Sequence, residues 1–157
     1  MIIGIIGGSQ IENKTIYDIA YKTGALIAQN NWFLVCGGLG GVMEAAAKGA
    51  FDNKGITIGI LPQSEIKCAN PYIKIPIATG MGYARNHIIV HTADILLAIN
   101  GEYGTLNEIS AALSLKKRVI ALKTWELDKI GTIDPKIFIK VNTPEEAIKV
   151  IKSYENT

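Results

Sequence analysis

The chain has 157 residues, of which 48 % are hydrophobic, and its formal net charge at pH 7 is +2. This length suits one domain with a sizeable core, so we expect residues 1–157 to form a single domain. The apolar runs are far shorter than the roughly 20 residues that span a bilayer, and no secretory signal is visible, so we predict a cytoplasmic protein without membrane association. The lysines form no stripe, which disfavours nucleic acid as a partner.

Short apolar runs rich in Ile and Val alternate with amphipathic segments along the chain. Several of these runs are apolar on both faces, which is typical of buried parallel strands rather than of a sheet with one face in water. We predict strands over Ile2–Ile6, Trp32–Cys36, Thr57–Leu61, Ile73–Ile77, Asp94–Ile99, Val119–Leu122 and Ile137–Val141.

Amphipathic segments between these strands carry apolar residues at helical spacing. The last of them has the strongest start signal, because Thr143 is followed by Pro144 and then by two glutamates in the first turn. We predict helices over 16–27, 43–50 and about 81–92, and two more that begin near Thr105 and at Thr143. Residues 62–72 contain two prolines and are predicted to be irregular, either as a lid or, as we favour, as a surface connection.

The alternation of strand and helix predicts an α/β fold. We expect a single-domain, Rossmann-like, doubly wound and mainly parallel sheet of about seven strands with helices on both faces.

Three glycine-rich turns are predicted to lie at the carboxyl edge of this sheet, where doubly wound proteins bind their ligands. They are Gly7 to Ser9, Gly37 to Gly41 and the stretch of residues 99–110, which contains Gly101 and Gly104. Glycine lets backbone N–H groups approach an anion, and the helix that follows adds a favourable potential. Tight turns also need glycine for steric reasons, but three on one edge favour a small phosphorylated ligand.

Two familiar nucleotide-binding signatures are absent. No G-x-G-x-x-G follows the first strand, and the second strand ends in Cys36 and Gly37 rather than in an acid that could bind a ribose hydroxyl, which argues against a nicotinamide dehydrogenase. No G-x-x-x-x-G-K-[ST] occurs either, which argues against a P-loop enzyme.

Arg85 and Glu108 are the charged candidates for this site. Arg85 stands near the start of a predicted helix, where a cation interacts unfavourably with the helix dipole. A guanidinium at this position can hold a phosphate. The alternative is that Arg85 is a solvated surface residue. Glu108 follows Thr105 at the spacing of a capping box, in which it would bond back to the Thr105 N–H. In the alternative interpretation Glu108 is a general acid or base in the cavity.

No metal site is expected. His87 and His91 stand four residues apart, but residue 88 is isoleucine where a metalloprotease helix would have glutamate, and no third ligand is evident. Lys48 lies well inside a predicted helix, so we do not expect it to form a Schiff base.

The motifs together resemble those of the LONELY GUY-like Rossmann proteins, which are often labelled possible lysine decarboxylases. Residues 37–43 resemble the G-G-x-x-G-x-M turn of that family, and residues 101–108 resemble its P-G-G-x-G-T-x-x-E motif. Arg85 precedes Asp94 by nine residues, as the family's arginine does before its next strand. The form Ala84-Arg85-Asn86 looks closer to the branch of molybdenum cofactor carrier proteins and small relatives of DNA-processing protein A. The resemblance covers nearly the whole chain.

In the enzymes of this family, the resemblance implies hydrolysis of the N-glycosidic bond of nucleoside 5′-monophosphates to give the base and ribose 5-phosphate. Glu108 and Arg85 would then be the catalytic pair. Lysine decarboxylation has no support, because no residue set for a pyridoxal cofactor is evident. The resemblance and the glycine turns together give these ligand-binding candidates: Gly8, Ser9, Gly37, Gly38, Gly40, Gly41, Arg85, Asn86, Gly101, Tyr103, Gly104 and Thr105.

Two departures from the enzyme motifs favour the carrier branch. Asn100-Gly101-Glu102 replaces Pro-Gly-Gly, and Glu102 adds negative charge where a phosphate should lie. Asn86 stands where the enzymes commonly have lysine. Three hypotheses follow: a carrier of a nucleotide-like or molybdopterin-type ligand that requires no other cofactor, a nucleoside-monophosphate phosphoribohydrolase, or a DNA-interacting module. The family's habit implies a homodimer or homotetramer.

Overall fold

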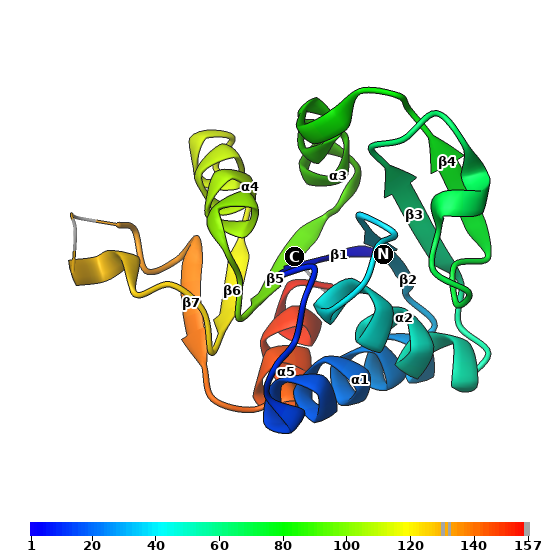
Figure 1. Cartoon of the computed structure of the whole chain (residues 1–157). Coiled ribbons are helices and arrows are strands. Elements are labelled where there is room, and N and C mark those ends of the chain that lie inside the picture. Colours follow the sequence, from blue (N-terminus) through cyan, green and yellow to red (C-terminus); the bar gives the residue numbers. More distant parts are fainter. Residues whose placement is uncertain (130, 132, 156–157) are drawn as a thin grey trace.

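The computed structural model describes residues 1–129, 131 and 133–155. These residues form a seven-stranded sheet in the order β4-β3-β2-β1-β5-β6-β7, with each strand parallel to its neighbours (Figure 1). The strands are β1 (Ile2–Gly7), β2 (Phe33–Cys36), β3 (Thr57–Leu61), β4 (Ile75–Ala78), β5 (Ile95–Ile99), β6 (Val119–Leu122) and β7 (Phe138–Val141). The predicted doubly wound α/β fold is therefore confirmed.

Helices cover both faces of the sheet (Figure 1). Within the described residues, the α-helices are α1 (Lys14–Gln29), α2 (Val42–Asp52), α3 (Asn86–Thr92), α4 (Tyr103–Ser114) and α5 (Pro144–Glu155), and short 3-10 helices are η1 (Ile66–Cys68), η2 (Gly82–Arg85) and η3 (Leu127–Lys129). Ile3 and Ile5 of β1 pack toward α1, α2 and α5, whereas Ile6 packs toward α3 and α4. Burial on both faces explains why the central strands are apolar without alternation.

One predicted strand and one predicted helix begin later in the structure than the sequence pattern indicates. Strand β4 begins two residues later than predicted, because the turn at Asn70 extends to Ile73, whose N–H donates to the Asn70 carbonyl at 3.2 Å. The segment from Met81 does not begin as an α-helix but as η2, and α3 starts only at Asn86. The N–H groups of Gly80 and Gly82 donate to the carbonyls of Gln63 and Pro62, so this stretch is bound to the preceding loop rather than to a helix.

Helices α1 and α2 cross with their backbones in contact. A Cβ added at Gly24 of α1 would lie 1.9 Å from the carbonyl oxygen of Ala46, and one added at Gly49 of α2 would lie 1.9 Å from that of Tyr21. Any side chain larger than hydrogen would therefore separate the helices. This crossing fixes α2, and with it the turn from β2 into α2.

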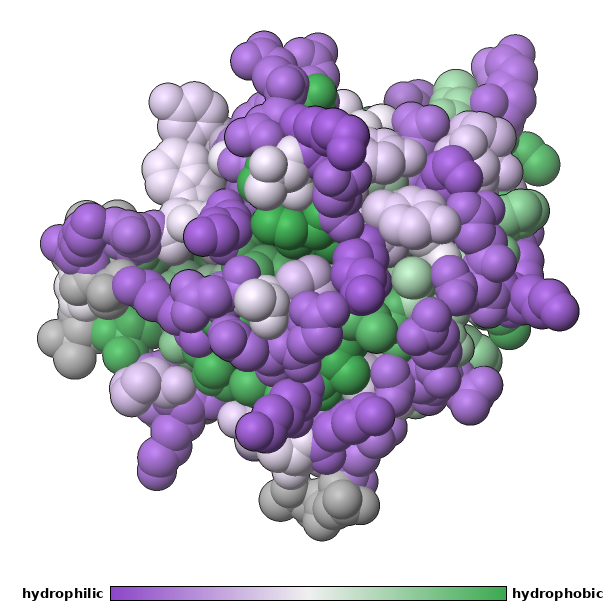
Figure 2. All heavy atoms as spheres, turned by 90° about the horizontal axis from the view of Figure 1, so that it is seen from below, coloured by the Kyte–Doolittle hydropathy of each residue, from purple (hydrophilic) through white to green (hydrophobic). Residues whose placement is uncertain are grey.

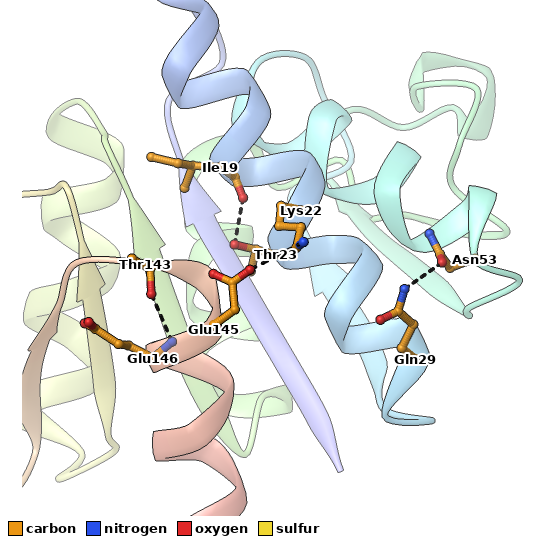
Figure 3. A network of polar contacts seen from close by, with 8 residues as sticks. All are labelled: Ile19, Lys22, Thr23, Gln29, Asn53, Thr143, Glu145 and Glu146. Carbon is orange, nitrogen blue, oxygen red and sulfur yellow. Dashed lines mark hydrogen bonds and ion pairs between the residues drawn. The ribbon is translucent and has the colours of Figure 1, made fainter.

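Polar contacts connect α1 to its neighbours on either side (Figure 3). Lys22 of α1 lies 3.4 Å from the carboxylate of Glu145 in α5, and Gln29 donates to Asn53, at the end of α2, at 3.0 Å. The predicted start of the last helix is confirmed, because the Glu146 N–H donates to the Thr143 hydroxyl at 3.2 Å. Hydrophilic side chains cover most of the face on this side of the molecule (Figure 2), as amphipathic helices require.

Lys117 holds the end of α3. Its ammonium group donates to the carbonyls of Val90, His91 and Ala93 at 2.8, 2.7 and 2.7 Å. These carbonyls lie at the carboxyl end of α3, where a helix leaves acceptors without intrahelical partners and favours a cation. Lys117 thereby fixes the helix whose other end begins at Asn86.

No helix in the described part of the chain combines the length and the apolar character needed to cross a bilayer.

Candidate functional site

A cavity of about 670 Å³ opens at the carboxyl ends of the central strands. Its lining comes from the end of β1 and the following turn, from the turn after β2, from η2 and the start of α3, and from the first turns of α4. β1 lies between β2 and β5, so the cavity is at the point where the strand order reverses, the usual ligand position in doubly wound sheets. Its volume is within the range of roughly 300–1,000 Å³ of small-molecule sites.

The cavity brings together most of the predicted site residues, although they come from four separate segments. Those that line it are Gly8, Ser9, Gly37, Arg85, Asn86, Tyr103, Gly104, Thr105 and Glu108. Gly38, Gly40, Gly41 and Gly101 do not line it. Gly41 lies against the backbone of Gly8 and Ser9 instead, so it serves the packing of one turn on another.

Several lining residues were not among the ligand-binding candidates, although Gly7, Leu39 and Glu102 belong to the predicted glycine-rich turns. They are Ile5, Ile6, Gly7, Leu39, Met43, Tyr83, Ala84, His87, Glu102 and Asn107. Tyr83 and His87 flank the Ala84-Arg85-Asn86 motif, so proximity in sequence was the available signal for them. Residues 62–72 contribute nothing to the lining. They form a surface connection, and Asn70 binds the Gly38 and Leu39 carbonyls at 2.9 and 2.8 Å.

Arg85 is buried in the cavity wall, with 7 % of its surface exposed, so the alternative of a solvated surface arginine is wrong. Its Nε donates to the Ile60 carbonyl at 2.8 Å, Nη2 donates to the Gly37 carbonyl at 3.4 Å, and Nη1 donates to Asn86 Oδ1. Burial lowers the pKa of Arg85, and nearby Glu108 opposes that shift. A guanidinium nevertheless stays protonated in proteins, so the wall carries a fixed cation.

Glu108 is also 7 % exposed and lines the same cavity. In the described part of the chain, no group donates a hydrogen bond to its carboxylate, and no cation lies within 4.0 Å of it. Burial raises the pKa of Glu108 to about 8, although Arg85 acts in the opposite direction. At neutral pH the side chain is therefore mostly a neutral acid.

The capping-box interpretation of Glu108 is wrong. Helix α4 begins at Tyr103, so Thr105 lies inside its first turn and Glu102 is the N-cap residue, without a side-chain cap. The reason is Gly101, whose φ is 123° and whose added Cβ would lie 2.6 Å from the Thr105 side chain. The N-cap of the helix lies three residues earlier than the Thr-x-x-Glu pattern indicates, and Glu108 is left to face the cavity.

The remaining candidates for chemistry lie in other environments. Among the described residues, no group of three or more His, Cys, Asp or Glu side chains is placed to hold a metal ion. His87 lines the cavity and His91 does not. Cys36 is fully buried at the end of β2, and burial raises the pKa of its thiol to about 12. Lys48 pairs with Asp52 at 2.7 Å on the outside of α2, away from the cavity.

Comparisons of sequence place the chain among known proteins. The model of the SLOG cluster4 family matches residues 1–156. An uncharacterised protein of Archaeoglobus fulgidus is 45 % identical over 152 residues, which cover 94 % of this chain and 92 % of that protein.

Solved structures are similar over almost the full length. The molybdenum cofactor binding protein of the phototrophic bacterium Rippkaea orientalis has a TM-score of 0.90 and 37 % identity, covering 97 % of this chain and 95 % of its own. The molybdenum cofactor carrier protein of Chlamydomonas reinhardtii has a TM-score of 0.89 and 31 % identity, covering 99 % of both chains. DNA processing protein A of Helicobacter pylori shares the fold alone: it has a TM-score of 0.75 and 18 % identity, covering 98 % of this chain and 80 % of its own. The predicted resemblance to this branch is confirmed.

Proposed function

The chain belongs to the SLOG cluster4 family, and from this membership and the cavity we propose that it binds a phosphate-bearing, nucleotide-like ligand of the molybdopterin type and acts as its carrier or binding protein. The similar proteins of Rippkaea orientalis and Chlamydomonas reinhardtii, which bind or carry the molybdenum cofactor, support this ligand class. The ligand would lie at the carboxyl edge of the sheet.

Arg85 is the observation that carries the proposal. A guanidinium has five N–H donors. Three of them are used by Ile60, Asn86 and Gly37, so two remain without a protein acceptor among the described residues. A buried cation without a paired carboxylate is costly, and an anionic ligand in the cavity would offset that cost with charge-assisted hydrogen bonds.

The charge of the inner cavity also favours an anion. Because the pKa of Glu108 is raised to about 8, this side chain adds little negative charge at neutral pH and leaves the Arg85 cation dominant. The first N–H groups of α4 have no intrahelical acceptor and add a favourable potential. A Cβ added at Gly104 would meet nothing within 4 Å, so there is open space beside this helix end for a phosphate.

Calorimetry of Arg85→Ala tests the proposal. With ribose 5-phosphate as the probe, we expect binding to weaken by about 1–2 kcal/mol or more, as for a lost charge-assisted contact. Arg118→Ala is the matched control, because Arg118 is the other arginine of the chain and its guanidinium lies 3.9 Å from the Tyr154 ring centre, outside the cavity. Native mass spectrometry of the purified protein would also reveal a retained ligand. Unchanged binding in Arg85→Ala would remove Arg85 from the site.

The second candidate function is a nucleoside 5′-monophosphate phosphoribohydrolase, and Glu108 is the observation that favours it. Glu108 is buried beside a buried arginine, has no hydrogen-bond partner among the described residues, and has its pKa raised to about 8 by burial, which suits it to proton transfer near neutral pH. In its neutral form Glu108 would act as an acid that protonates the departing base rather than as a carboxylate that stabilises the ribose cation.

Incubation with AMP, CMP and GMP separates the two functions. Release of free base that disappears in Glu108→Gln would establish the hydrolase, and an intact nucleotide in every reaction would leave the carrier. If Glu108 acts as the acid, the rate falls as the pH rises through about 8; a rate that rises there assigns it the role of base.

A further inference from the structure

The cavity has two chemically different ends. At its inner end Arg85, Asn86, Thr105 and Glu108 are all buried. At its mouth the lining residues are exposed, and two of them are tyrosines: Tyr83 is 84 % exposed and Tyr103 is 83 % exposed. A ligand with an anionic end and a flat ring would place the anion inside and the ring at the mouth.

The two tyrosines reach the mouth from different elements. Tyr83 belongs to η2, which precedes α3, and Tyr103 is the first residue of α4. These helices follow different strands, so the tyrosines flank the cavity from two of its walls. The Tyr103 ring lies 6.2 Å from the Trp125 ring, measured between ring centres, and still keeps most of its surface exposed. Exposed aromatic side chains beside a cavity are suited to stacking on a planar ring, because every heteroaromatic ring presents a π-face.

Glu102 is another exposed residue of the cavity lining. It lines the cavity, and a Cβ added at Gly8 would lie 3.4 Å from its Oε1, so its carboxylate extends over the turn after β1. It makes no side-chain cap on α4, and in the described part of the chain it has no hydrogen-bond or ion-pair partner. A carboxylate accepts hydrogen bonds at two parallel oxygens and donates none, so it selects a group with two adjacent N–H donors.

We propose that Tyr83, Tyr103 and Glu102 form a ring-recognition subsite that selects a planar heterocycle with two adjacent N–H donors. The 2-amino-4-oxo rings of guanine and of pterins present such a pair, whereas adenine presents a ring nitrogen lone pair beside its amino group. The subsite rests on the proposed function, in which Arg85 holds the phosphate of the same ligand. It gives Glu102 a role that the departure from the enzyme motif otherwise leaves unexplained.

Calorimetric titrations with GMP, AMP and ribose 5-phosphate test the subsite. The wild-type protein is expected to bind GMP about tenfold more tightly than AMP, as for a bidentate hydrogen-bonded pair. Glu102→Gln should abolish that preference without weakening ribose 5-phosphate. Tyr83→Ala and Tyr103→Ala should each weaken both nucleotides about fivefold or more and leave ribose 5-phosphate unchanged, because a stacking contact is lost. The Phe variants at these positions keep the ring and should bind as wild type.

The three probes distinguish failure of the subsite from failure of the proposed function. Equal affinity for GMP and AMP in the wild type, or a GMP preference that survives in Glu102→Gln, overturns the subsite while ribose 5-phosphate binding remains intact. Loss of all three, or binding of ribose 5-phosphate that does not depend on Arg85, overturns the phosphate site and the subsite together. The three variants change exposed side chains, and thermal unfolding of each verifies that the fold is kept.

Discussion

Replacing Glu108 with glutamine keeps the shape of a buried side chain and removes its titration. In the folded protein the pKa of Glu108 is raised from 4.5 to about 8 by burial. The unfolded chain releases this proton near pH 4.5 and the folded chain holds it until about pH 8. The unfolded state therefore loses protons first, and the free energy of unfolding of the wild type falls as the pH rises between these values.

The size of the effect follows from the shift. Each pKa unit corresponds to about 1.4 kcal/mol, so the wild type should lose about 3 kcal/mol relative to Glu108→Gln between pH 4.5 and 7. The loss should reach about 5 kcal/mol and level off above pH 8. Burial of the glutamine amide adds a constant offset, which cancels when only the pH dependence of the difference is compared. A change of this size is large beside a typical stability of about 5–15 kcal/mol.

Urea unfolding of both proteins at half-unit pH steps measures the difference. Glu102→Gln is the matched control, because it removes a carboxylate from the same cavity at an exposed position. Parallel stability curves for the wild type and Glu108→Gln across pH 5–8 would contradict this prediction, since they would mean that Glu108 ionises as readily in the fold as in the unfolded chain.

Three further predictions concern the scaffold. Gly24→Ala should lower the free energy of unfolding by about 2 kcal/mol or more through overpacking of α1 on α2, whereas Gly104→Ala, with open space around its new Cβ, should cost far less in the same urea assay. Lys117→Met should cost about 2–3 kcal/mol by leaving helix-end carbonyls without their donor, and the exposed Lys116→Met should be near neutral. Light scattering should give the mass of a dimer or tetramer, because apolar side chains such as Ile77 remain exposed on the edge strand β4. The mass of a monomer at micromolar concentration would contradict this prediction.

The sheet could be predicted because its signal is local. All strands except β4, such as Ile95–Ile99, lie within one residue of their predicted bounds, because their apolar runs are bounded by turn residues, and the order of strand and helix then leaves few topologies. The start of β4 was predicted two residues too early, because the hydrogen bonds of the Asn70 turn compete with those between β3 and β4. Amino-acid composition does not reveal such a competition.

Much of the cavity lining was predictable from the sequence, but the burial of its charged residues was not. Arg85 and Glu108 were named from motif spacing and both line the cavity, yet the burial of Arg85 depends on carbonyls of Ile60 and Gly37, which are distant in sequence. The Thr105 pattern predicted a cap, and the turn at Gly101 overrode it. The only signal for Tyr83 was its position next to the Ala84-Arg85-Asn86 motif, because an exposed aromatic residue has no periodicity that marks a ligand contact.

The position of β1 between β2 and β5 has a consequence for folding cooperativity. The chain up to the start of α3 supplies the lining from β1, from the turn after β2 and from η2, and the chain after β5 supplies the lining from α4. Neither portion carries the complete cavity, so a molecule held there contacts both and binds only when they are docked. Its binding free energy is added to the stability of the assembled sheet and to neither portion alone. Hydrogen exchange with and without ribose 5-phosphate should therefore show the added protection in the amides that pair β1 with β5.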